Sequence, residues 1–219
     1  MKTLELESVL PDGTRVLFRP IEPSDKQMLQ EGLRQLSDES RYRRFFRHID
    51  HLSEKQLRYL TEVDGHDHVA WVAVLPELPG VPGVGVGRYI RLANEPDVAE
   101  AAVTVVDSYH HQGLGRTLLW LLARSAIEHG VGSFRAWTLG ENHPMMELLR
   151  SLGAQPGRWE GGALELTVPL PADLDDLDQS PAPLILKEVA RGTLQVEAHP
   201  DHPAGARLIS PSELWNRTT

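Results

Sequence analysis

The feature that most constrains the fold is the run of residues 99–130, in which a strand pattern passes almost directly into a long helix pattern. Residues 99–106 are apolar apart from Glu100 and one threonine, and residues 113–130 carry leucines at helical spacing. The loop between them ends in glycines at 113 and 115, which let the backbone come close to a ligand. The first N–H groups of a helix lack intrahelical partners and lie at the positive end of its dipole. The segment therefore predicts a cradle for an anion such as a diphosphate, to which Arg116 adds a positive charge.

Strand and helix patterns alternate through the rest of the first 171 residues. We expect strands at residues 3–10, 14–21, 69–75, 84–92, 99–106, 134–139 and 163–170. We expect helices at residues 23–36, 38–46, 53–63, 113–130 and 144–152, and a turn at 94–97. The first two strands form a hairpin because Pro11-Asp12-Gly13 is a turn sequence. The pattern predicts an α/β sheet covered by helices, mixed rather than purely parallel.

The composition argues against several classes of protein. The chain of 219 residues has a net charge of −9, whereas proteins that bind duplex nucleic acid usually present a basic face. No apolar run is long enough to span a bilayer, and the N-terminus alternates like a strand, unlike a secretory signal. With no cysteine there is no disulfide framework, and we expect a cytoplasmic protein without nucleic-acid or membrane partners.

The ten histidines are expected to be exposed loop residues rather than metal ligands. Three pairs stand close together in the sequence: His48/His51, His66/His68 and His199/His202. None has the fixed helical spacing and the neighbouring carboxylates of a zinc site. We therefore predict no metal site.

The composition changes after residue 171. We predict one domain at residues 1–171 and an appendage at residues 172–219. Residues 173–178 are acidic and flanked by prolines, which is typical of a linker. Residues 183–191 fit one short amphipathic helix, and residues 195–219 are expected to form a tail with little structure of its own.

The glycines at 113 and 115 do not fit two established phosphate-binding loops. The Walker pattern fails because no Gly-Lys-Ser/Thr follows, and the dinucleotide fingerprint fails because Leu118 stands where its third glycine belongs. The loop His-His-Gln-Gly-Leu-Gly at residues 110–115 instead resembles the acyl-CoA-binding motif Gln/Arg-x-x-Gly-x-Gly/Ala of the GNAT acetyltransferase superfamily, with His110 at its first position. Residues 141–145, followed by Leu-Gly-Ala at 152–154, resemble the superfamily segment that lies along the pantetheine arm of CoA.

Further segments narrow the resemblance. Residues 17–25, 36–46, 52–53 and 99–106 are similar to the catalytic domain of bacterial protein lysine acetyltransferases that modify acyl-CoA synthetases. The match covers roughly residues 14–154. This resemblance implies the GNAT fold, an α/β (α+β) arrangement in which helices cover both faces of a mixed, mostly antiparallel central sheet.

The resemblance also implies a set of residues that bind acetyl-CoA. The backbone of Val105 and Val106 is expected to pair with the pantetheine amides and to polarise the thioester carbonyl. Asn142 and Met145 are expected further along the arm, although Asn142 also suits a helix N-cap. The tyrosine that protonates the departing CoA thiolate in the superfamily falls at Leu149. The other expected contacts are His110, His111, Gln112, Gly113, Leu114, Gly115, Arg116 and Thr117.

Glu100 is the candidate general base. It interrupts an apolar strand, where an unpaired carboxylate is costly and its pKa should rise toward a useful value, and it matches the position of the family's proposed glutamate base. The alternative is that Glu100 forms an ion pair across the sheet with an arginine such as Arg88 or Arg91.

Four arginines crowd into residues 41–47, and two interpretations are open. At helical spacing Tyr42, Phe45 and Phe46 pack inward while the arginines stay solvated, which is the interpretation we favour. Alternatively the cluster belongs to the substrate-side lip and contacts an acidic protein partner through Arg43 and Arg44.

Three functions are consistent with these features. The leading hypothesis is transfer of an acetyl group from acetyl-CoA, without a metal, to a primary amine, above all a protein lysine. A small-molecule amine is the second acceptor class, because the superfamily changes acceptor readily on one scaffold. The third is a non-catalytic acyl-CoA-sensing module, favoured by the departures at His110 and Leu149 and opposed by Glu100. The partners we consider are the acceptor and a second copy of the chain in a homodimer.

Overall fold

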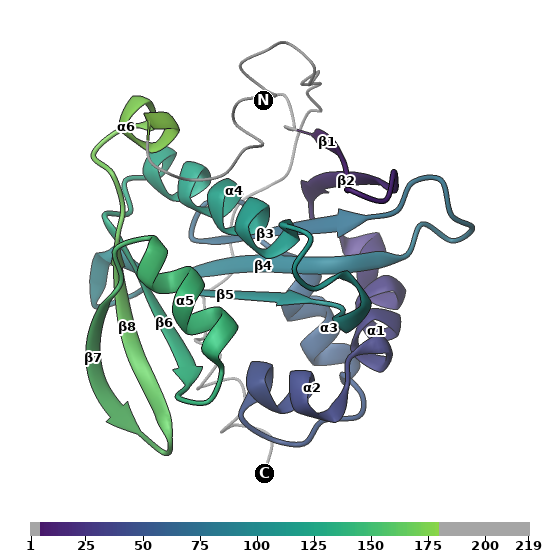
Figure 1. The fold of residues 1–219 in the computed structure, drawn as a ribbon, viewed down its shortest axis with the longest axis horizontal. Coiled ribbons are helices and arrows are strands. Elements are labelled where there is room, and N and C mark those ends of the chain that lie inside the picture. The colour runs from purple at the N-terminus through teal and green to yellow at the C-terminus, as the bar shows by residue number, and fades with distance from the viewer. Residues whose placement is uncertain (1–4, 180–219) are drawn as a thin grey trace.

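The computed structural model describes residues 5–179, which build one eight-stranded sheet with helices on both faces (Figure 1). The strands are β1 (Leu6–Val9), β2 (Arg15–Pro20), β3 (His68–Val74), β4 (Gly83–Leu92), β5 (Glu95–Val105), β6 (Ser133–Leu139), β7 (Gln155–Glu160) and β8 (Ala163–Pro169). Their order is β1-β2-β3-β4-β5-β6-β8-β7, and the β5–β6 pair alone is parallel among the described strands. The predicted mixed, mostly antiparallel sheet is confirmed.

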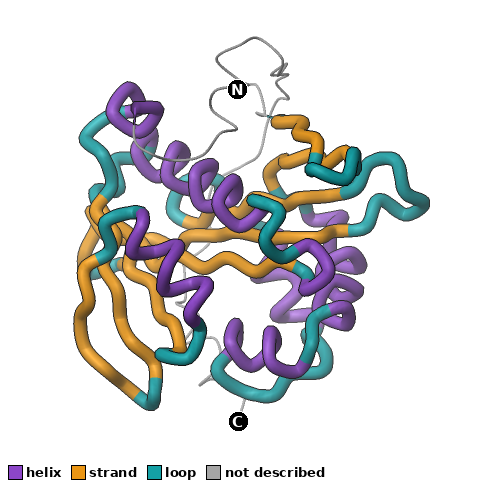
Figure 2. The backbone as a smooth tube through the Cα atoms, in the orientation of Figure 1, coloured by secondary structure: helices purple, strands orange, loops and turns teal. Residues whose placement is uncertain are grey.

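The helices lie in two groups on opposite faces of the sheet (Figures 1 and 2). One group is α1 (Lys26–Gln35), α2 (Asp38–Phe45) and α3 (Glu54–Thr61). The other is α4 (Leu114–Glu128), α5 (His143–Ser151) and the short α6 (Leu174–Gln179). None of the helices described is long and apolar enough to cross a membrane.

Local sequence explains most of these elements. Ser37 and Ser53 cap α2 and α3 by accepting hydrogen bonds from backbone N–H groups of the first helical turn. β3 is buried along its whole length, as its continuous apolar run predicts for a central strand. Gly85 and Gly87 on β4 let α4 pack closely, since a Cβ at either position would lie 3.1 Å from a leucine methyl of that helix.

The sheet splits between β5 and β6. These strands pair over only three residue pairs, the last of which joins Glu100 to Arg135. Beyond that pair β5 continues to Val105 and β6 to Leu139 without further pairing between them. The backbone edges that face each other past Glu100 are therefore left without strand partners, which opens the sheet for a ligand.

Three sequence expectations need correction. The turn predicted at residues 94–97 is shorter, because β5 already begins at Glu95. Strand β7 was not expected, since Gln-Pro-Gly-Arg-Trp-Glu shows no alternation; it is an exposed edge strand held by pairing with β8. The acidic segment 173–178 is not an extended linker but mostly α6, whose Leu177 is buried in the core that includes α4.

Two expectations fall outside the described residues: the helix at 183–191 and the tail at 195–219. The division between residues 1–171 and 172–219 stays a prediction.

Candidate active site

A groove of about 1470 Å³ follows the split in the sheet and passes the start of α4. All of the residues predicted for the site line this groove except Val106. It is also lined by Ser40, Arg43 and Arg44 of α2; the sequence offers the two arginines only in the alternative interpretation of the cluster and does not offer Ser40. Residues from β5, the following loop, α4, α5 and α2 thus meet in one place.

The register of β4 and β5 decides which backbone groups face the groove. The Val106 N–H donates to the Val84 oxygen at 2.9 Å, so Val106 belongs to the β4 pairing and not to the groove. Because backbone groups alternate in direction along a strand, Ala101, Val103 and Val105 direct theirs toward the open side. The predicted backbone contact of Val106 with the pantetheine arm is therefore wrong, whereas the backbone of Val105 does face the groove.

His110 supports the same geometry. Its Nε2 lies 2.9 Å from the Val105 oxygen, which places that carbonyl on the groove side of β5. The side chain that replaces the superfamily's Gln or Arg is thus turned back onto the strand.

The predicted cradle is present at the start of α4. Gly113 is its N-cap with φ +88°, a left-handed conformation that favours glycine, and no side chain caps the helix. The Thr117 N–H donates to the Gly113 oxygen at 3.0 Å and makes the first hydrogen bond of the helix. The N–H groups of residues 114–116 precede that bond and remain available to an anion. Thr117 itself is buried, and its hydroxyl lies 3.2 Å from the Gly113 oxygen, so its side chain braces the turn.

The α5 side of the groove confirms one of the two expected roles of Asn142. Its Oδ1 caps α5 by accepting a hydrogen bond from the Met145 N–H at 3.4 Å. This leaves the Nδ2 group as the donor for a ligand. Leu149 is 2% exposed and packs in the core, so no hydroxyl stands at the position of the superfamily's tyrosine.

Glu100 lies at the point where the sheet opens. Alternation along β5 puts its side chain on the face covered by α1–α3, opposite to Val103 and Val105, which pack on the α4 side. Burial raises the pKa of Glu100 above its ordinary value, and the positive charges of Arg44 and Arg135 oppose that rise. Within residues 5–179 no ion pair of 4.0 Å or less is made by Glu100.

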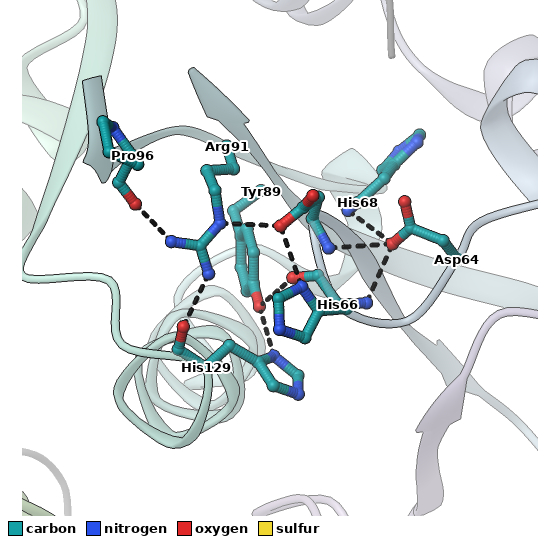
Figure 3. Close-up of polar contacts among 8 residues, drawn as sticks. Asp64, His66, His68, Tyr89, Arg91, Pro96 and His129 are labelled. Atoms are coloured by element: carbon teal, nitrogen blue, oxygen red, sulfur yellow. Dashed lines mark hydrogen bonds and ion pairs between the residues drawn. The ribbon is translucent and has the colours of Figure 1, made fainter. Parts of the chain in front are cut away.

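The alternative partners of Glu100 are engaged elsewhere. Arg88 is buried, and its Nη1 lies 3.0 Å from Nε2 of His68 and 3.2 Å from the Leu60 oxygen. Arg91 donates from Nε to Asp67 at 2.7 Å and also contacts the backbone oxygens of Pro96 and His129 (Figure 3). The alternative interpretation, an ion pair of Glu100 with Arg88 or Arg91, is therefore wrong.

The expectation that all histidines are exposed loop residues is also wrong. His68 is 2% exposed on β3, and burial together with the Arg88 charge lowers its pKa to about 3. Of the three histidine pairs, His199/His202 lies outside the described residues. Among the residues described, no group of three or more His, Asp or Glu side chains is arranged to hold a metal ion.

Helix α2 differs from the favoured interpretation of the arginine cluster. Tyr42 and Phe46 are each 40% exposed, whereas Arg44 is partly buried with its guanidinium 5.1 Å from the centroid of the Phe45 ring. Burial lowers the pKa of Arg44, and the charge of Glu100 counteracts this. The aromatic side chains do not all pack inward, and Arg44 is turned to the site.

The chain was compared with known proteins. Residues 26–154 match the model of the Acetyltransferase (GNAT) family. The chain belongs to this acetyltransferase family. The GNAT domain of S. lividans PAT has a similar structure, with a TM-score of 0.69 and 32% identity over 76% of this chain and 97% of that one.

Two curated relatives of this chain are also named acetyltransferases. Acetyltransferase Pat of Mycolicibacterium smegmatis is 34% identical over 159 residues, which are 73% of this chain and 47% of that protein. Acetyltransferase PA5475 of Pseudomonas aeruginosa is 31% identical over 144 residues, 66% of this chain and 77% of that protein. The chain thus spans about half the length of the M. smegmatis relative.

The groove suits the co-substrate of GNAT acetyltransferases, acetyl-CoA. A diphosphate fits the N–H groups at the start of α4, and an extended amide-bearing arm fits the unpaired β5 edge. Arg44 is a functional candidate that the sequence offers only in the alternative interpretation of the arginine cluster, and the structure places it in the lining of the groove.

Proposed function

We propose that this acetyltransferase moves the acetyl group of acetyl-CoA to the ε-amine of a lysine on a protein, with Glu100 as the general base. The observation that carries the proposal is the position of Glu100, a partly buried carboxylate on the α2 side of the split, next to the β5 edge that would receive the thioester. The resemblance of residues 14–154 to bacterial protein lysine acetyltransferases supports a protein acceptor.

The chemistry follows from this arrangement. Glu100 takes a proton from the acceptor ammonium or amine, directly or through one water, and the amine nitrogen attacks the thioester carbonyl carbon. The groove-facing N–H groups of Val103 and Val105 are the donors available to the oxygen that becomes negative. The C–S bond then breaks, the amide remains on the acceptor, and the CoA thiolate acquires a proton that balances the one taken from the amine.

The cradle and the arm position that reaction. The N–H groups of residues 114–116, with Arg116, would hold the diphosphate, and Asn142 Nδ2 would contact the arm. These contacts fix the thioester relative to Glu100 before the acceptor arrives. Because Leu149 has no proton to give, the thiolate must be protonated by another group or by solvent.

A small-molecule amine is the second candidate acceptor. The specific observation in its favour is that the groove is open and is lined on the α2 side by both aromatic and cationic side chains. A small amine could contact such a lining without the rest of a protein substrate.

An acceptor screen tests the proposal. Release of CoA thiol from acetyl-CoA would be measured with a panel of small amines, lysine peptides and an acyl-CoA synthetase, and thermal shift with acetyl-CoA would be recorded in parallel. We expect a thermal shift and thiol release with a lysine-bearing protein. Release with small amines alone would move the acceptor to that class. A thermal shift without release from any acceptor would refute the enzyme and favour an acyl-CoA sensor.

A further inference from the structure

Arg44 occupies an unusual position for an arginine in a surface helix. It lies in the last turn of α2 and lines the groove that contains Glu100. It also lines a second cavity of about 70 Å³ under β4 and β5, together with Arg88 and Thr104. Its guanidinium stacks on Phe45. The side chain is therefore directed into the protein, where a cation requires a compensating charge.

Helix α2 is fastened to the strand that carries Glu100. Asp107 lies two residues after the end of β5, and its carboxylate accepts hydrogen bonds from the Ser37 N–H at 3.0 Å, the Ser37 hydroxyl at 2.8 Å and the Ser40 hydroxyl at 2.7 Å. Ser37 is the N-cap of α2, so these bonds fix the start of the helix relative to the end of β5. Arg44 is consequently held at a defined place over the site.

The other arginines of α2 have different partners. Arg41 pairs with Asp38 at 2.6 Å and with Asp50 at 3.5 Å, and Arg43 pairs with Glu39. By contrast, the acidic group that acts on Arg44 is Glu100.

Two cations face Glu100, and one of them is already committed. Arg135 on β6 makes two hydrogen bonds to Glu95, at 2.8 and 3.0 Å, and its Nε lies 4.0 Å from Glu165. Arg44 comes from α2 and lines the small cavity together with Arg88 of β4, where burial and the charge of Arg44 lower the pKa of Arg88 to about 9. Of these two cations, Arg44 is the one that makes no ion pair of 4.0 Å or less within the part of the chain that the structure describes.

We propose that Arg44 is a positioning residue for the base: from α2 it holds a positive charge toward the Glu100 carboxylate in the groove that both side chains line. This rests on the proposed function only for its catalytic consequence, because the charge state of Glu100 can be measured without turnover. The positive charge of Arg44 also disfavours an acceptor ammonium beside Glu100, which helps the neutral amine to form.

The first test is a direct titration of Glu100. Protein labelled with ¹³C at the glutamate carboxyl carbons would be titrated by NMR, with Glu100→Gln used to assign the Glu100 signal. In Arg44→Gln we expect the Glu100 midpoint to move to higher pH, because the carboxylate loses an opposite charge, and in Arg44→Lys we expect most of that change to be reversed. Arg41→Gln is the matched control, since Arg41 is a cation of the same helix whose ion pairs lie away from the groove. The Glu100 midpoint in Arg41→Gln should equal that of the wild type.

The second test is the pH profile of kcat/KM with the best acceptor from the screen. In Arg44→Gln the acid limb of the profile should move to higher pH. We expect kcat/KM to fall by about fivefold at about pH 6 and to equal the wild-type value at high pH. Thermal unfolding of each variant would show whether it folds. An unchanged Glu100 midpoint in folded Arg44→Gln, or a loss of the same size at every pH, would overturn the role of Arg44.

The two proposals fail in different ways. If Glu100→Gln keeps wild-type turnover, the proposed base is wrong even where the NMR midpoint still responds to Arg44. If Glu100→Gln abolishes the acid limb and Arg44→Gln leaves it in place, only the role of Arg44 is wrong.

Discussion

Gly113 offers a quantitative test of the diphosphate cradle. Its φ of +88° lies in the left-handed region, and a Cβ there would meet no atom within 4 Å, so replacement by alanine costs conformational energy rather than a steric clash. That cost is about 1–2 kcal/mol for an L-residue, partly offset by the lower chain entropy of alanine in the unfolded state. For a chain of this size about 1 kcal/mol corresponds to a fall in Tm of about 2–4 °C.

Gly115 provides the matched control for Gly113. It is inside α4, and a Cβ would lie 3.8 Å from Cγ2 of Val105 and 3.9 Å from Cγ1 of Val103, which are ordinary contacts. Alanine in a helix is favoured over glycine by up to about 1 kcal/mol, so Gly115→Ala should leave Tm unchanged or raise it.

Both variants would be measured by thermal unfolding and by calorimetric titration with acetyl-CoA. If the strained turn of Gly113→Ala relaxes, the N–H groups of residues 114–116 move, and the loss of one or two charge-assisted hydrogen bonds weakens binding by about tenfold or more. Gly115→Ala should bind acetyl-CoA with a smaller loss than Gly113→Ala. Wild-type stability and affinity in Gly113→Ala, or equal losses in both variants, would refute the reasoning.

Three further variants test other parts of the account. Asp107→Ala leaves the donors of Ser37 and Ser40 without their acceptor and should cost about 1–2 kcal/mol at neutral pH. Burial raises the pKa of Asp107, but these hydrogen bonds outweigh burial and lower it. The stabilisation by Asp107 is therefore present above its unfolded pKa of about 3.9 and is lost as the pH falls through its folded pKa. Urea unfolding that gives the same cost of Asp107→Ala at low and at neutral pH would contradict this. Leu177→Ala should destabilise the protein by about 2–3 kcal/mol in urea unfolding, because Leu177 is buried. An unchanged stability would instead indicate that residues 173–178 are a linker outside the core. Glu100→Gln should be at least as stable as the wild type at neutral pH, because a raised pKa means that folding disfavours the carboxylate; a clear loss in the same measurement would show an unrecognised ion pair.

The sequence predicted the parts of this fold that are encoded locally. The strand, glycine loop and helix at 99–130 were correct because apolar periodicity, glycine and helix-start chemistry all act within a few residues. Ser53 and the turn at residues 11–13 were predictable for the same reason. Strand β7 was not, because Pro156 and Gly157 are poor strand residues and its pairing with β8 comes from the tertiary fold.

The errors at the site also come from long-range geometry. Val106 was assigned to the groove because a strand pattern alone does not say which backbone groups point outward; the β4–β5 register decides that. The ion pair considered for Glu100 could not be tested from the sequence, since Arg88 and Arg91 are both plausible partners until the elements are placed. Packing directs Arg88 to His68, and Arg44 to the groove.

The central claim is that Glu100 acts as the base in acetyl transfer, and Glu100→Gln tests it most directly. The substitution keeps the shape of the side chain but cannot accept the proton. With the best acceptor at saturating acetyl-CoA, we predict that kcat, measured by CoA release at neutral pH, falls by about 10²–10⁴, while calorimetry gives an unchanged Kd for acetyl-CoA. Wild-type kcat in a folded Glu100→Gln protein would contradict the account.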